Sequence, residues 1–166
     1  MKHGRKQKLP WYVQPESPAV ATFLCRACGA TLTKSLQRLH DQTALTNEES
    51  MPLVPQDAYW LVAEGHLPTS FDGEPVDFTG CYAVHPHALV GVGNHPDRER
   101  WMGCCGPSGT GGPNRICGCG RPIGTERSDC MWPIAVYLEP KAVRPGYPEA
   151  EQSGQPEPPI TRILKS

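Results

Sequence analysis

The sequence predicts a small β-rich or α+β domain with long loops that is stabilised by a bound metal ion. The 166 residues include 17 glycines and 19 prolines, which is about 22% of the chain against a usual share of about 12%. Such a composition favours turns and irregular loops over long regular elements. The chain also contains eight cysteines, and a chain with a thin core gains stability from cross-links such as metal ions.

Short apolar stretches bounded by turn signals predict the strands. Residues 19–24 (AVATFL) lead directly into a cysteine, and residues 30–39 alternate in the manner of a half-buried strand, although a short helix over 33–40 also fits the leucine spacing. Residues 57–67 have a strand-like apolar centre, and residues 132–140 form the clearest late strand. In that last stretch, one face is expected to carry Ile134, Val136 and Leu138, and the other Ala135 and Tyr137.

Two cysteine pairs have the pattern of metal-binding knuckles, which are tight turns that direct two thiolates at one cation. They are CRACG (residues 25–29) and CGCG (residues 117–120). The glycine after each pair allows a left-handed backbone conformation and lets backbone amides point towards the sulfurs. Tetrahedral zinc takes four ligands. We therefore expect one Zn²⁺ to be bound by Cys25, Cys28, Cys117 and Cys119.

These two knuckles resemble the zinc-ribbon class, in which two β-hairpins hold one structural zinc between them. The resemblance covers only residues 25–29 and 117–120, with strands implied on either side. The second knuckle has one intervening residue instead of two, and the insert between the knuckles is long. The block over 103–132 is also similar to a cysteine-rich block of uncharacterised small bacterial proteins, and this similarity implies no activity.

Four cysteines remain outside this ligand set. Cys104, Cys105 and Cys130 are secondary metal candidates, with His95 as a nitrogen ligand of the same second site. Alternatively, Cys104 or Cys105 replaces a member of the first site. Cys81 is expected to be a buried core thiol. Three outcomes thus remain open: one zinc bound by four cysteines, two metal ions, and disulfides or no metal.

Three segments are expected along the chain: an extended basic arm over 1–18, a zinc-stabilised β-rich domain over 19–139, and a proline-rich, disordered tail over 140–166. The start of the chain lacks the apolar run of a secretory signal, and no stretch has the roughly 20 apolar residues that cross a bilayer. These features predict a cytoplasmic protein without membrane contact. Because thiols stay reduced in the cytosol, the cysteines favour metal over disulfides.

An alternative interpretation is that the chain is a small zinc-dependent hydrolase or a thiol/redox enzyme. His85 and His87 lie two positions apart, so an extended backbone places both imidazoles on one face, and catalytic zinc sites use such pairs with an open water position. His95 is a further candidate for such a cleft. The vicinal pair Cys104 and Cys105 is the candidate for redox chemistry.

The preferred interpretation is that the chain is a binding module for a protein or a nucleic acid. A structural zinc with four protein ligands has no open coordination position for catalysis. No catalytic residue is assigned. The net charge of −1 gives no general attraction to nucleic acid, so such binding would be local. Its candidate contacts are Arg26, Lys34, Arg38, Arg98, Arg100, Arg115, Arg121 and Arg127, with Trp101 and Trp132 as stacking faces.

Overall fold

A computed structural model of the protein describes residues 19–63 and 76–147, and these residues form one nine-stranded sheet. The expected basic arm over 1–18 and the part of the expected tail from residue 148 lie outside the described residues. The strands are β1 (Val20–Cys25), β2 (Leu36–Arg38), β3 (Ala58–Leu61), β4 (Tyr82–Val84), β5 (Val92–Asn94), β6 (Arg115–Cys117), β7 (Pro122–Arg127), β8 (Ala135–Leu138) and β9 (Val143–Gly146).

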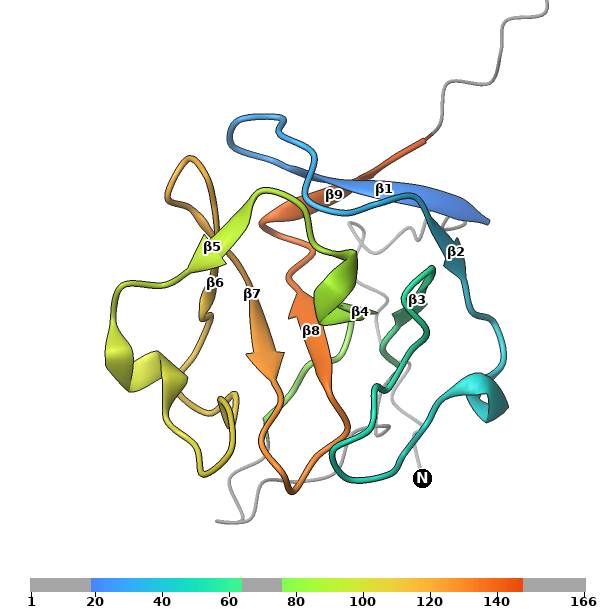
Figure 1. Ribbon diagram of the computed structural model, residues 1–166. Coiled ribbons are helices and arrows are strands. Elements are labelled where there is room, and N and C mark those ends of the chain that lie inside the picture. Colours follow the sequence, from blue (N-terminus) through green and yellow to red (C-terminus); the bar gives the residue numbers. More distant parts are fainter. Residues whose placement is uncertain (1–18, 64–75, 148–166) are drawn as a thin grey trace, which may run out of the picture.

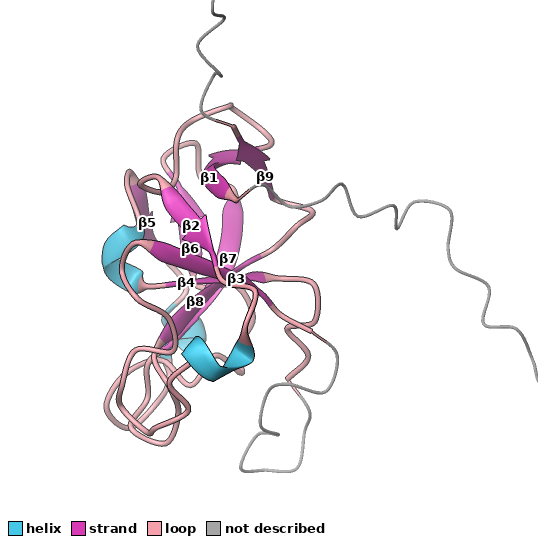
Figure 2. Ribbon diagram, turned by 90° about the vertical axis from the view of Figure 1, so that its right-hand side faces the viewer, coloured by secondary structure: helices cyan, strands magenta, loops and turns pink. Residues whose placement is uncertain are grey.

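The described residues contain no α-helix, so the β-rich form of the predicted fold is confirmed. Three short 3-10 turns lie outside the strands (Figure 2): η1 (Gln42–Ala44), η2 (Pro86–Ala88) and η3 (Arg98–Trp101). The alternative helix over 33–40 is not formed. That segment instead makes an isolated bridge from Thr33 to Leu89 and then strand β2.

The strand order is β5-β6-β7-β8-β4-β3-β2-β1-β9. Only β2 and β3 pair in parallel, and all other neighbours are antiparallel. The pair β1 and β9 crosses the ends of β7 and β8 instead of continuing beside them (Figure 1). The sheet is therefore strongly curved, and the end of β1 comes close to β6 although five strands lie between them in the pairing order.

Strand β8 lies between two apolar clusters, which explains why its residues are buried on both faces. Val136 and Leu138 belong to the first cluster, whereas Ala135 and Tyr137 belong to the second. This is the alternation predicted from the sequence, since successive side chains of a strand point to opposite faces. In the second cluster the Tyr137 ring stacks on Phe78 with ring centres 4.0 Å apart.

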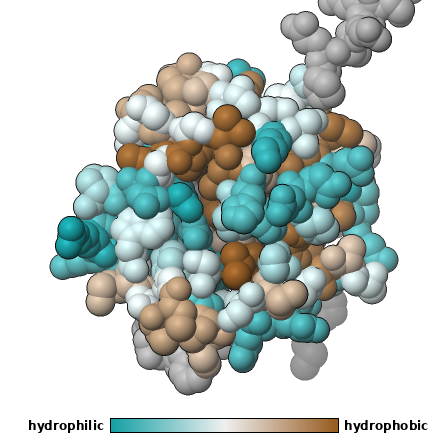
Figure 3. Space-filling view, viewed as in Figure 1, coloured by the Kyte–Doolittle hydropathy of each residue, from teal (hydrophilic) through white to brown (hydrophobic). Residues whose placement is uncertain are grey.

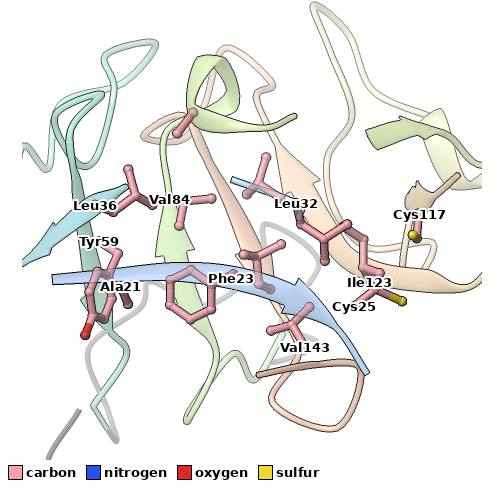
Figure 4. Packing of buried hydrophobic residues seen from close by; sticks show 13 residues of the cluster. Ala21, Phe23, Cys25, Leu32, Leu36, Tyr59, Val84, Cys117, Ile123 and Val143 are labelled. Atoms are coloured by element: carbon pink, nitrogen blue, oxygen red, sulfur yellow. The ribbon is translucent and has the colours of Figure 1, made fainter. Parts of the chain in front are cut away.

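The first cluster fills the concave side of the curved sheet and includes two of the predicted metal ligands. Phe23 packs edge-on against Tyr59, with ring centres 5.1 Å apart. Cys25 and Cys117 are each 1% exposed and belong to the same cluster. Figure 4 shows the Cys25 sulfur at the end of β1, on the side where β6 carries Cys117.

The ordered sheet extends beyond the domain boundary expected at residue 139. Strand β9, Val143–Gly146, lies inside the expected tail and pairs with β1 in antiparallel register. Val143 is fully buried and contributes to the first cluster. The expected start of the tail at residue 140 was therefore too early, because the partner strand rather than local composition orders this segment.

None of the helical turns in residues 19–63 and 76–147 is long and apolar enough to cross a membrane.

Candidate metal centre

The curvature of the sheet brings together the four cysteines of the two predicted knuckles. Their sulfur atoms all lie within 4.8 Å of one another, and the group could hold a metal ion. The Sγ atoms of Cys25 and Cys119 are 3.9 Å apart, and those of Cys28 and Cys117 are 3.5 Å apart. Two sulfurs bound at about 2.3 Å to one tetrahedral cation lie about 3.8 Å apart. We call this group the four-thiol site.

The first knuckle is the turn that follows β1. The Cys25 N–H donates to the Ala30 carbonyl over 2.9 Å, and the Gly29 N–H donates back to the Cys25 carbonyl over 2.8 Å. Gly29 has a φ of 76°, in the left-handed region that favours glycine. The returning chain then pairs Thr31 with Leu24 of β1, so the knuckle is the tip of a hairpin.

The second knuckle, between β6 and β7, repeats these bonds with a turn that is one residue shorter. The Cys117 N–H donates to the Arg121 carbonyl over 2.9 Å, and the Gly120 N–H donates to the Cys117 carbonyl over 2.8 Å. Gly120 has a φ of 86°. The single intervening residue of CGCG therefore does not prevent the turn from directing both thiols at the site.

The inner and outer thiols of each knuckle have different surroundings. Cys25 and Cys117 lie at strand ends and are buried, whereas Cys28 and Cys119 are exposed. Burial acts to raise the pKa of Cys25, but the backbone N–H groups of Cys28 and Ala27 outweigh it and lower this pKa to about 7. Burial raises the pKa of Cys117 to about 12. The surroundings of the two inner thiols thus shift their pKa values in opposite directions.

A second group of possible ligands comprises Cys104, Cys105, Asp129 and Cys130, whose ligand atoms also lie within 4.8 Å of one another. The three expected thiols do come together, but His95 is not among the four. Its Nδ1 accepts the Asp97 N–H over 3.1 Å, which makes it part of the turn that precedes η3. Asp129, and not His95, lies beside the three cysteines.

Asp129 was not singled out from the sequence, although a carboxylate directly before Cys130 was visible there. Its Oδ1 accepts the N–H groups of Cys105 and Cys130 over 3.1 and 2.7 Å, and its Oδ2 accepts that of Cys104 over 3.2 Å. Burial alone would raise the pKa of Asp129, but these donors lower it. The carboxylate is thus an anion that organises the backbone of all three cysteines.

His85 and His87 have roles in local structure. His85 is 7% exposed and its Nδ1 accepts the His87 N–H over 3.0 Å, which caps η2. The ring centres are 5.0 Å apart. Neither imidazole belongs to a group of possible metal ligands within the described residues. Within the part of the chain that the structure describes, no third ligand joins the two imidazoles.

Several candidate nucleic-acid contacts interact with other side chains of the protein. Arg115 forms an ion pair with Glu126 and lies 5.4 Å from the Trp101 ring centre. Arg127 is 1% exposed and lies 3.9 Å from the Trp132 ring centre. Each tryptophan ring thus already has a cation of this protein near it, and the buried Arg127 cannot contact a partner.

Comparisons with protein-family models, with curated proteins and with solved structures found no match to this chain.

Proposed function

We propose that this chain is a binding module in which a structural Zn²⁺ at the four-thiol site joins the two knuckles. The observation that carries the proposal is the convergence of four thiols that lie up to 94 positions apart in the sequence. Four thiolates complete the tetrahedral shell that zinc adopts in structural sites. No coordination position then remains for a substrate or an activated water.

The position of the site in the sheet supports a structural role. Cys28 and Cys117 are 89 positions apart, and closing a loop of this length costs about 4 kcal/mol of chain entropy. Structural zinc contributes about 10–16 kcal/mol in small peptides. The binding free energy of a zinc ion would therefore exceed the entropy cost of holding β1 against β6. The zinc-ribbon resemblance agrees with this role at the level of the two knuckles.

The surface beside the knuckles supports the binding part of the proposal. Arg26 lies against the turn between β8 and β9, where its Nε donates to the carbonyls of Pro140 and Val143. The exposed cations of this region form a rim, which we call the basic rim and which consists of Arg26, Arg121, Lys141 and Arg144. Such a rim favours an anionic partner. In the view of Figure 3, hydrophobic residues gather in the upper half of the molecule, and an exposed apolar patch favours a protein partner.

The structural zinc is tested by metal analysis of the full chain purified without added zinc, combined with a Cys117→Ser variant. We expect the wild-type chain to retain zinc at the four-thiol site. Because Cys117 is an inner ligand at the end of β6, we expect the variant to lose this zinc and to unfold at lower denaturant concentration. A variant that keeps the wild-type metal content and stability contradicts the structural assignment.

The binding role is tested by the electrophoretic shift of mixed RNA and DNA at increasing salt. Replacing Arg121 by Glu in the basic rim should weaken binding and reduce its salt dependence, because fewer phosphate contacts release fewer counterions. The matched control is Arg98→Glu, an exposed cation on η3 outside the rim. Absence of binding even at low salt would exclude nucleic acid and leave a protein partner.

A further inference from the structure

We propose that Cys104, Cys105 and Cys130 form a second metal site that binds a thiophilic d10 cation, Zn²⁺ or Cu⁺, through three thiolates. We call it the three-thiol site. It is separate from the four-thiol site and does not depend on the proposed structural zinc. Whereas the four-thiol site joins distant strands, the three-thiol site is built on one loop and the end of β7.

The sulfur positions match those of ligands to a single cation. The Sγ atoms of Cys104 and Cys130 are 3.8 Å apart, close to the separation of about 3.8 Å expected on one tetrahedral ion. The vicinal pair Cys104 and Cys105 is closer, at 3.2 Å. Both separations exceed the S–S bond length of about 2.05 Å. All three sulfurs lie within 4.8 Å of one another, and none is joined in a disulfide.

The loop that carries the vicinal pair is sterically defined. It is closed by the Ser108 N–H donating to the Met102 carbonyl, and anchored to the end of β7 by the Ser128 N–H donating to the Pro107 carbonyl. A Cβ on Gly106 would lie 2.7 Å from the Ser128 carbonyl oxygen. A Cβ on Gly103 would overlap the backbone of Gly106. The two glycines of GCCG therefore allow the tight turn that brings both thiols to one side.

Asp129 is the positioning residue of this site. Its carboxylate is 7% exposed and accepts one backbone N–H from each of the three cysteines. A carboxylate with three donors is held firmly, and it fixes the three Cα positions from which the thiols extend. Outer groups that orient metal ligands in this manner typically contribute 10–100-fold to metal affinity.

The exposure of the site indicates that its metal can exchange. Cys104 and Cys105 are exposed and Cys130 is half-buried, whereas each knuckle of the four-thiol site has a buried inner thiol. Met102 and Met131, both exposed, lie close to the site in sequence. Thiolate and thioether sulfur favour Cu⁺ and Zn²⁺ over hard cations such as Mg²⁺. Three thiolates leave a tetrahedral Zn²⁺ one position for water, while Cu⁺ needs no fourth ligand.

The test begins with the wild-type full chain, reduced and kept without oxygen, and titrated with Zn²⁺ or with Cu⁺ in separate arms. We expect two ions per chain, the second being removed by a competing chelator before the first. Alkylation with and without the second ion, read by mass spectrometry, should show protection of Cys104, Cys105 and Cys130 only. If all eight thiols are reduced and neither cation binds beyond one per chain, the three-thiol site is refuted.

Two variants separate this proposal from the structural zinc. The double variant Cys104→Ser/Cys130→Ser should bind one ion instead of two and keep its far-UV circular dichroism, because Cys104 is exposed, Cys130 is half-buried and neither belongs to an apolar cluster. Cys81→Ala, outside both groups, is the matched control and should bind two. Cys117→Ser should lose the first ion but not the second. Two ions in the double variant would overturn the proposal while leaving the four-thiol site intact.

The Asp129→Asn variant tests the positioning role. An amide NH₂ cannot accept the backbone N–H that faces it, so we expect the second ion to bind about 10–100-fold more weakly and the first to bind as in the wild type. The intensity of the thiolate-to-metal band with Co²⁺ as probe reports the number of sulfur ligands at each site. Unchanged second-site affinity would refute the role of Asp129, and formation of a disulfide in place of metal uptake would refute the site.

Discussion

At the residue scale, the backbone of two glycines determines how the knuckles direct their thiols. Gly29 and Gly120 have φ values of 76° and 86°, and a Cβ added at either would meet no atom within 4 Å. Their requirement therefore comes from the local backbone and not from contact with another element. A side chain here would raise the free energy of the turn, because its Cβ would lie too close to the following carbonyl oxygen.

Replacing Gly120 by Ala should lower the free energy of unfolding by about 1–2 kcal/mol, which is the cost of a left-handed conformation for an L-residue. The measurement is urea denaturation of the metal-loaded protein. Gly93→Ala is the control, because its Cβ would make an ordinary contact of 3.7 Å with Ile116 and its φ is not left-handed. Equal losses in both variants would contradict the conformational argument.

A second residue-scale prediction concerns His85. Burial, together with the charge of His87, lowers the pKa of His85. The unfolded state therefore binds a proton more readily than the folded state, so stability is complete above a pH of about 6.5 and falls as the pH drops below it. We expect His85→Asn, which keeps an acceptor for the His87 N–H, to lose less stability than the wild type between pH 7.5 and pH 5.5.

Denaturant midpoints at the two pH values check this prediction. The wild type and the His85→Asn variant carry the same thiols, so any loss of metal at low pH affects the stability of both. Comparing the drop in midpoint of the variant with that of the wild type removes this effect. The same drop in both proteins would show that His85 does not contribute to the pH dependence.

At the element scale, β9 completes the sheet beside β1. Its register pairs Val143 with Cys25, so the last strand supports the strand that ends in the four-thiol site. Arg26 strengthens this connection, because its N–H donates to the Ala142 carbonyl over 2.9 Å. The position of the first knuckle thus depends on a segment that follows it by more than a hundred residues.

Replacing Val143 by Ala should cost about 2 kcal/mol of stability, because it removes two buried carbon atoms from a fully buried position. Arg144→Ala is the matched control on the same strand, since Arg144 is exposed. Thermal unfolding distinguishes the two variants. A negligible effect of the Val143 change would mean that β9 does not belong to the folded core.

At the scale of the whole molecule, the four-thiol site closes a curved sheet whose two linked strands are distant in pairing order. The larger apolar cluster lies on the concave side and contains both inner thiols. Removing a metal ion from this position would release a connection between β1 and β6 and expose part of that cluster. We therefore expect the stability of the sheet to depend on the occupancy of the proposed zinc site.

A strong chelator should accordingly lower the thermal midpoint of the full chain and broaden its transition. Because metal binding stabilises only the folded state, restoring free Zn²⁺ should raise the midpoint as its concentration increases. Differential scanning fluorimetry at several zinc concentrations checks this. The thermal midpoint of the variant Cys104→Ser/Cys130→Ser should change with chelator and zinc as in the wild type. The Cys117→Ser variant should lack the part of this change that comes from zinc at the four-thiol site.

Local features of the sequence were sufficient to predict the β-rich class, the alternating faces of residues 134–138 and the two knuckles. Each of these depends on neighbouring residues: apolar alternation, or a cysteine pair followed by glycine. They could be read because strand periodicity and turn chemistry act over a few positions.

Only the tertiary structure determined the partners of these local elements. Composition suggested a tail from residue 140, but pairing with β1 orders Val143–Gly146. His95 was expected beside the remaining cysteines, but it caps its own turn, and Asp129 lies there instead. Pairing between distant strands and the burial of a carboxylate beside three amides depend on how the chain returns on itself. No local pattern encodes that geometry, so the sequence identified which thiols could bind metal and the fold determined which atoms meet.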